Sequence, residues 1–128
     1  MAGLFGTGPF FVSVSAMKDL LERKCKPCEG GVEPLTLDQA KELMAALHPD
    51  WMLAASGKSI RRDFEFSAFG RTIAFANAVA WVATTEGHHP EMTINYGSCR
   101  VCYTTTAING LSDNDFICAA KIDRLAAE

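Results

Sequence analysis

Residues 59–96, SIRRDFEFSAFGRTIAFANAVAWVATTEGHHPEMTINY, decide the fold of this chain. Apolar and charged side chains alternate over residues 59–66, which is typical of a strand with one buried face. Ser67 is then expected to cap a helix that runs to about Glu86, with Gly87 as its stop. The centre of this helix is almost wholly apolar, so we expect it to be buried against a sheet or against another subunit.

Two predicted hairpins flank this helix. Residues 51–55 form the first strand of one hairpin, which turns at residues 57–58. Residues 92–96 and 99–106 alternate in the same way around a turn at residues 97–98, which predicts the second hairpin. The chain therefore carries four strands in two adjacent pairs.

Further helices are predicted on both sides of the hairpins. Thr36 and Gln39 have the spacing of a capping box, so a helix begins there and ends at His48, which precedes a proline. Ser112 begins a last helix that continues to Leu125. The predicted order is helix, two strands, helix, two strands, helix.

The length of 128 residues fits one domain. We assign this domain to residues 35–128. Residues 1–34 are rich in glycine, proline and small polar residues and are interpreted as an N-terminal extension, with a helical turn or two around residues 15–23.

The bulk composition excludes several classes of partner. The formal net charge is −3 and the basic residues are scattered, so nucleic acid is not an expected ligand. The apolar run at residues 9–12 is too short to span a bilayer, and no basic residue precedes it as a signal peptide requires. We expect a cytoplasmic protein that does not bind membranes.

The chain has five cysteines, an odd number, so reduced thiols are the default expectation. Cys25 and Cys28 have the spacing of a zinc knuckle, but the second half of a four-ligand site is absent from their neighbourhood. Cys99 and Cys102 lie on a predicted strand, where odd spacing sends side chains to opposite faces. No metal site is predicted at either pair.

His88 and His89 stand between the end of the apolar helix and Pro90. An imidazole titrates near neutral pH and can both take and give a proton, so a loop presenting two of them is a candidate acid–base site. Such a turn can instead satisfy backbone groups at a helix end, and the residues alone leave both interpretations open. A metal site would need a further ligand, and His48 fits better as a terminal residue of the first helix.

The spacing around these histidines resembles the signature of the pterin-4a-carbinolamine dehydratases. The residues that carry the resemblance are Glu86-Gly87-His88-His89-Pro90, Tyr96 after five intervening residues, Thr106 after nine more, Gly110-Leu111-Ser112 and Asp115-Phe116. The resemblance spans residues 35–125 and includes Trp51 and residues 63–69. The Cys25 and Cys28 pair is similar to that of bacterial members.

The resemblance implies an α+β fold, in which a four-stranded antiparallel sheet carries three helices on one face in the order αββαββα. It implies a homodimer or homotetramer that removes water from 4a-hydroxytetrahydropterins to give the quinonoid dihydropterin, without a metal or organic cofactor. By the same resemblance, the catalytic residues are His88, for acid–base work, and His89, for positioning. The implied substrate-binding residues are Trp51, Glu86, Pro90, Thr105, Thr106, Ala107 and Ile108.

Thr106 departs from the family pattern, in which this position usually holds a histidine. A threonine hydroxyl does not exchange protons near pH 7, although it can hold a water or bind a ligand. General acid–base groups each contribute on the order of a hundredfold to ten-thousandfold to a rate. We therefore expect low or absent activity.

Two hypotheses of different classes follow. The first is a weakened dehydratase acting on a pterin, in which His88 works alone or with a water held by Thr106. The second is a non-catalytic dehydratase-like protein that binds a protein client. Members of the family stabilise dimers of a transcription factor or assemble RuBisCO in α-carboxysome bacteria, and the bacterial Cys25 and Cys28 pair favours the RuBisCO type.

Overall fold

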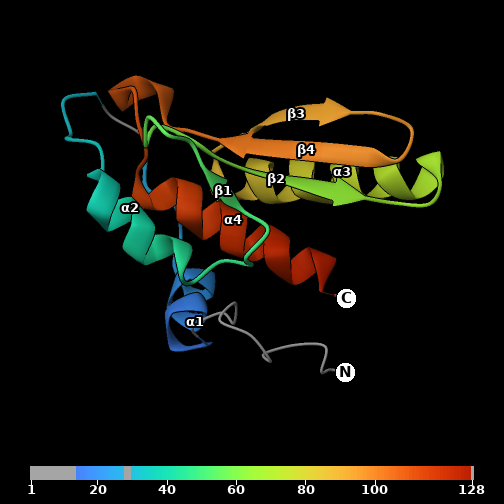
Figure 1. The fold of residues 1–128 in the computed structure, drawn as a ribbon, viewed down its shortest axis with the longest axis horizontal. Coiled ribbons are helices and arrows are strands. Elements are labelled where there is room, and N and C mark those ends of the chain that lie inside the picture. The colour runs from blue at the N-terminus through green and yellow to red at the C-terminus, as the bar shows by residue number, and fades with distance from the viewer. Residues whose placement is uncertain (1–13, 28–29, 128) are drawn as a thin grey trace.

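The structure, a computed structural model, describes residues 14–27 and 30–127 (Figure 1). Within these residues, four strands form one antiparallel sheet in the order β1-β2-β4-β3, accompanied by four α-helices, so the protein is α+β. The strands are β1 (Met52–Leu53), β2 (Ile60–Glu65), β3 (Glu91–Ile94) and β4 (Ser98–Tyr103). The helices are α1 (Val14–Glu22), α2 (Leu37–Met44), α3 (Phe69–Glu86) and α4 (Asp113–Ala126), with a 3-10 turn, η1 (Thr106–Ile108), before α4.

Helix α1 corrects the predicted order αββαββα. Where a helical turn or two was expected, residues 14–22 form a nine-residue helix, so the described chain has four α-helices and the order ααββαββα. Leu20 of α1 is 1% exposed and belongs to the hydrophobic core. The helix packs against α4, and this contact between distant segments leaves no signal in the local sequence.

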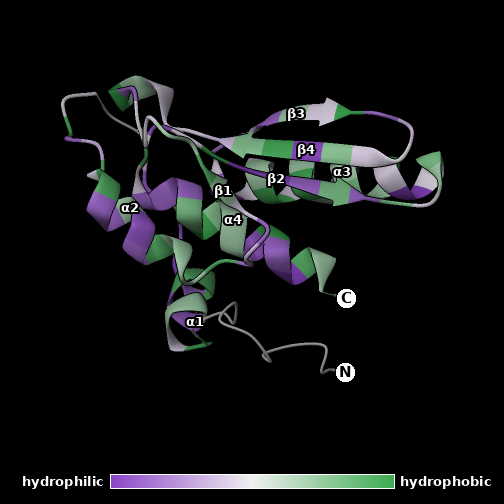
Figure 2. Cartoon of the chain, viewed as in Figure 1, coloured by the Kyte–Doolittle hydropathy of each residue, from purple (hydrophilic) through white to green (hydrophobic). Residues whose placement is uncertain are grey.

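The centre of the sheet is the pair β2 and β4. Their register places Phe64 opposite Cys99 and Arg61 opposite Cys102. Side chains alternate between a buried face and an open face, and Figure 2 shows one hydrophilic segment between two hydrophobic ones in the middle of β4. Cys99 is buried and Cys102 is partly exposed on the other face, as the odd spacing predicts.

Helix α3 packs against β3 and β4, and α4 lies beside α3 (Figure 1). The ring centroid of Phe75 on α3 lies 4.5 Å from that of Phe64 on β2, which joins helix and sheet in one core. The prediction that Ser67 caps α3 is wrong. The N-cap is Ala68, which makes no side-chain cap hydrogen bond. Gly87 ends α3, as predicted.

Capping boxes begin the two helices that flank the sheet in sequence. The Thr36 side chain accepts from the Gln39 N–H, and Gln39 returns a bond to the Thr36 N–H, so the predicted start of α2 is confirmed. Ser112 and Asp115 form the second box at the start of α4. This box fixes Asp115 at the edge of the core. Over the described residues, no helix is both long and apolar enough for a membrane span.

Candidate functional site

The loop after α3 places His88 in the interior. Gly87 adopts a left-handed backbone, with φ of 68°, which glycine accepts without strain. The His88 N–H then donates to the Ala83 carbonyl at 3.0 Å, and the whole residue is 8% exposed. Its ring stacks on Tyr103 with 5.2 Å between centroids, and the Tyr103 hydroxyl donates to the His88 carbonyl at 3.1 Å. Both the ring and the backbone of His88 are therefore fixed.

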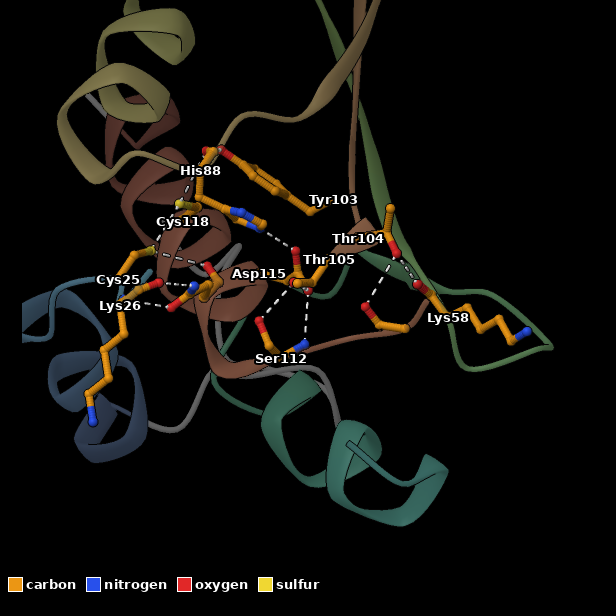
Figure 3. A network of polar contacts seen from close by, with 12 residues as sticks. Cys25, Lys26, Lys58, His88, Tyr103, Thr104, Thr105, Ser112, Asp115 and Cys118 are labelled. Carbon is orange, nitrogen blue, oxygen red and sulfur yellow. Dashed lines mark hydrogen bonds and ion pairs between the residues drawn. The ribbon is translucent and has the colours of Figure 1, made fainter. Parts of the chain in front are cut away.

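Asp115 holds the imidazole of His88 from the opposite side (Figure 3). Its Oδ1 lies 2.6 Å from His88 Nε2. Its Oδ2 accepts from Thr105 Oγ1 at 2.8 Å and from the Ser112 N–H at 2.9 Å. Thr105 Oγ1 also lies 2.8 Å from Ser112 Oγ. This carboxylate has no solvent exposure, and its three partners compensate for the loss of water.

The protonation of His88 follows from this contact. Burial alone lowers the pKa of the imidazole, but the hydrogen bond to Asp115 and the negative charge of Asp115 outweigh burial. The pKa of His88 is therefore raised above its ordinary value. His88 keeps its proton to a higher pH than a free imidazole does.

His88 and His89 line an open cavity of about 420 Å³, here called the histidine pocket. Its lining residues are Ala80, Ala83, Thr84, Gly87, His88, His89, Pro90 and Met92. His89 is exposed, whereas His88 shows the pocket only a small part of its ring. The structure thus brings three predicted site residues, His88, His89 and Pro90, to one cavity.

A second cavity of about 300 Å³ lies between the N-terminal extension and the start of α4. Its lining residues are Lys26, Pro27, Val32, Glu33, Leu35, Thr105, Ile108, Ser112, Asp113 and Asn114. Thr105 and Ile108 were predicted as site residues beside the histidines, and they line this cavity instead of the histidine pocket. The hydroxyl of Thr105 still connects the two places, because it bonds to the carboxylate that holds His88.

Thr106 and Ala107 are exposed on η1 and line neither cavity. Trp51 also lines neither cavity. It is 3% exposed, and its Nε1 donates to Asp123 Oδ1 at 2.7 Å. The catalytic and binding roles of these residues stay predictions.

Glu86 makes structural contacts at the end of α3. Its carboxylate accepts from Lys121 Nζ at 2.6 Å and from the Cys25 N–H at 2.9 Å. Burial alone raises its pKa, but these two donors outweigh burial, and the pKa is lowered below its ordinary value. Glu86 is therefore an ionised anchor for the extension and for α4.

Two residues around His88 were not predicted as part of the site. Asp115 has a local explanation in the sequence, as a helix-start residue, and this hides its longer-range contact with His88. Tyr103 reads as a buried strand residue, and nothing in its spacing indicates that it stacks on an imidazole. In the part of the chain that the structure describes, no group of three or more histidine, cysteine or acidic side chains is placed to hold a metal ion. Cys28 lies outside that part.

Fold and site together define a small α+β protein with a histidine loop beside an open pocket and a buried carboxylate behind the first histidine. The sequence model of the pterin 4 alpha carbinolamine dehydratases matches residues 33–125. The chain belongs to this family.

Relatives that carry the family's name are closely similar in sequence. One from Nitrosomonas eutropha is 56% identical over 107 residues, covering 84% of this chain and 93% of the relative. One from Legionella pneumophila is 44% identical over 110 residues, covering 86% of this chain and 97% of the relative.

Solved structures show the same fold. A transcriptional coactivator/pterin dehydratase from Brucella melitensis aligns with a TM-score of 0.68 and 29% identity, over 73% of this chain and 99% of that protein. A pterin dehydratase-like protein identified as a RuBisCO assembly factor in the alpha-carboxysome aligns with a TM-score of 0.55 and 22% identity, over 63% of this chain and 94% of that protein.

Proposed function

We propose that this protein is a 4a-hydroxytetrahydropterin dehydratase of reduced activity, which removes water to give the quinonoid dihydropterin. The proposal is supported by family membership and, above all, by the His88–Asp115 pair in the wall of the pocket that also exposes His89. We place the activity in the cytoplasm, because unpaired thiols such as the four described cysteines persist in a reducing compartment.

The reaction asks one group to take a proton from a ring N–H and another to protonate the departing hydroxyl. His88 suits the second role, since Asp115 raises its pKa and the imidazole keeps its proton to a higher pH than a free one does. His89 is exposed in the pocket and positions the pterin together with Pro90. Thr106 cannot act as a base near pH 7 and does not line the histidine pocket, so a water molecule takes that part and the reaction is slow.

The implied substrate contacts of Trp51, Glu86 and residues 105–108 form a weaker part of the proposal. Trp51 and Glu86 are engaged in buried contacts with Asp123 and Lys121, respectively. Their substitution is therefore expected to act on stability as well as on binding. No metal or organic cofactor takes part in the proposed reaction.

Restoring the missing histidine is the sharpest test. Dehydration of a 4a-hydroxytetrahydropterin is followed for the wild type, His88→Ala and Thr106→His. We expect the wild type to exceed the uncatalysed rate, His88→Ala to fall to it, and Thr106→His to gain on the order of a hundredfold. His48→Ala changes a histidine that lines neither cavity and should keep the wild-type rate. The proposal is rejected if all four proteins react at the uncatalysed rate.

A second candidate function is favoured by Thr106, which removes a proton carrier while leaving the scaffold intact. In this alternative the protein binds a client, with RuBisCO of an α-carboxysome bacterium as the proposed client. The RuBisCO assembly factor with the shared fold is the precedent. Co-elution with purified RuBisCO on a sizing column, retained in His88→Ala, would support it. Separate elution at all concentrations would reject it.

We also propose that the protein is a homodimer or homotetramer. Large apolar side chains on and near α3 are exposed in the single chain: Trp81 is 71% exposed, Tyr96 69% and Phe69 48%. Exposed apolar surface of this kind favours association. Light scattering should give two or four times the chain mass of 13.9 kDa, and the mass of a single chain would reject the proposal.

A further inference from the structure

Two thiols from distant parts of the chain meet behind the histidine pocket. Cys25 follows α1, and Cys118 lies on α4, 93 residues later. Their Sγ atoms are 3.6 Å apart, which is van der Waals contact (Figure 3). Sulfurs at this distance need to approach by only about 1.5 Å to reach disulfide bonding distance.

The backbone around Cys25 is held in place by contacts to two helices. The Cys25 N–H donates to Glu86 Oε1 at 2.9 Å. The Lys26 N–H donates to Asn114 Oδ1 at 3.0 Å, and Asn114 Nδ2 returns a bond to the Lys26 carbonyl at 2.7 Å. Arg23 forms an ion pair with Asp113 at 2.8 Å. The encounter of the two sulfurs is therefore built into the fold and does not depend on one flexible side chain.

The two sulfurs differ in access and share a proton. Cys118 is fully buried, whereas Cys25 is partly exposed. The hydrogen-bonding contact between the two sulfurs, in which either can be the donor, lowers the pKa of Cys118 and raises the pKa of Cys25. When the pair loses one proton, the negative charge therefore lies mainly on Cys118. The thiolate of Cys25, the reactive form of cysteine, arises when the remaining shared proton crosses to Cys118.

We propose that Cys25 and Cys118 are a site of reversible oxidation, at which hydrogen peroxide produces an intrachain disulfide. The Cys25 thiolate attacks one peroxide oxygen, the O–O bond breaks, and Cys25 becomes a sulfenic acid while the leaving hydroxide takes up a proton to form water. The sulfur of Cys118 then attacks the Cys25 sulfur, and the sulfenic oxygen leaves with the Cys118 proton as a second water. Two thiols are oxidised by two electrons, and one peroxide is reduced to two waters.

The bond would join the extension covalently to the helix that carries Asp115. It would also remove the Cys118 S–H that contacts the His88 carbonyl at 3.8 Å. This site is independent of the proposed dehydratase activity, because neither sulfur lines the histidine pocket.

Cross-link mapping tests the proposal on the full chain. Trypsin leaves Cys25 and Cys28 in one peptide, and Cys102 and Cys118 in another. The variant Cys28→Ser/Cys102→Ser therefore makes the assignment unique. After treatment with peroxide, we expect a linked pair of peptides lacking two hydrogens, which dithiothreitol separates, in both this variant and the wild type. Cys25→Ser should abolish the link, and Cys102→Ser alone should retain it.

Thermal unfolding supplies a second readout that does not depend on a variant. A bond closing so long a loop should raise the unfolding midpoint of the oxidised wild type by at least about 5 °C, and reduction should reverse the shift. A Cys25–Cys28 bond in the oxidised wild type would overturn the proposal. So would oxidation of the separate thiols with no linked peptides.

Discussion

Two carboxylates on α4, Asp115 fully buried and Asp123 mostly so, have different partners. Asp115 contacts a histidine and two neutral donors, and it is fully enclosed. Asp123, eight residues further along the helix, accepts from Trp51 Nε1 and Arg62 Nη1, each at 2.7 Å, and from the His48 N–H at 2.9 Å. Arg62 also lies over the Phe64 ring, 4.3 Å from its centroid.

The difference between the partners separates a responsive region from a permanent one. An imidazole can lose its charge within the physiological pH range, whereas a guanidinium stays charged. The His88 end can therefore change state with pH or with a ligand. The Arg62 end contains no imidazole, and its carboxylate joins β2, the loop after α2 and α4.

Removing the permanent anion should have the largest effect. Asp123→Ala leaves the mostly buried Arg62 charge without its anion and Trp51 Nε1 without its acceptor. We expect the free energy of unfolding in urea to fall by about 3–5 kcal/mol. Arg124→Ala, on the exposed neighbouring position, should change it by less than about 0.5 kcal/mol. If the two variants are equally stable, Asp123 is not the link we describe.

Removing the charge at the responsive end should be milder. In Asp115→Asn the imidazole of His88 can become neutral, so no unpaired cation is left buried. The amide N–H₂ of the new asparagine cannot accept a hydrogen bond, so a donor from Thr105 or Ser112 that faces it loses its partner. We expect a loss of about 1–3 kcal/mol in unfolding free energy and a lower pKa of His88 in an NMR titration. Asp50→Asn, at an exposed carboxylate, is the control. A loss as large as that of Asp123→Ala would contradict the comparison.

The pH dependence should distinguish the two ends. The folded-state pKa of His88 is raised, so the stabilisation from its pairing is fully present below about pH 6.5 and is lost as pH rises through the folded-state value. The stability difference between wild type and Asp115→Asn should therefore narrow between about pH 6 and pH 9, with a slope of at most about 1.4 kcal/mol per pH unit. The difference for Asp123→Ala should stay flat. A widening difference at Asp115 would reverse the assigned sign.

The smallest effect is expected on the open face of the sheet. Arg100 Nε donates to Asp63 Oδ1 at 2.7 Å, but both side chains are 48% exposed. Solvent screens such a pair, so Arg100→Ala should leave the urea midpoint unchanged within error. A clear shift of the urea midpoint would show that short distance, and not burial, determines how much these ion pairs contribute to stability.

Local patterns account for the parts of the fold that the sequence predicts. The Thr36–Gln39 box, the alternation in β2 and β4 and the Gly87 stop each depend on residues close together in the chain. Helix α1 was predicted only as a turn or two, because it packs against α4 through the buried Leu20, far away in sequence. The N-cap of α3 lies one residue later than predicted, at Ala68, whose side chain makes no cap hydrogen bond, so the local capping rule could not identify it.

The candidate site was likewise predicted only where local spacing determines it. Sequence spacing places His88 and His89 in one loop, and the structure puts both at one pocket. The sequence does not indicate that the ring of His88 points to Asp115, since a carboxylate in a first helical turn already has a local explanation. The packing of the whole chain determines which of the two adjacent histidines is buried, so local spacing cannot predict it.

The strand order β1-β2-β4-β3 also has a kinetic consequence. Each outer strand pairs with its neighbour in sequence, so the two hairpins can form early from local contacts. The central pairing of β2 with β4 must close a loop that contains all of α3, and loop closure of this length slows folding. Substitutions at the β2–β4 seam, such as at Phe64, should therefore retard refolding more than substitutions in β1.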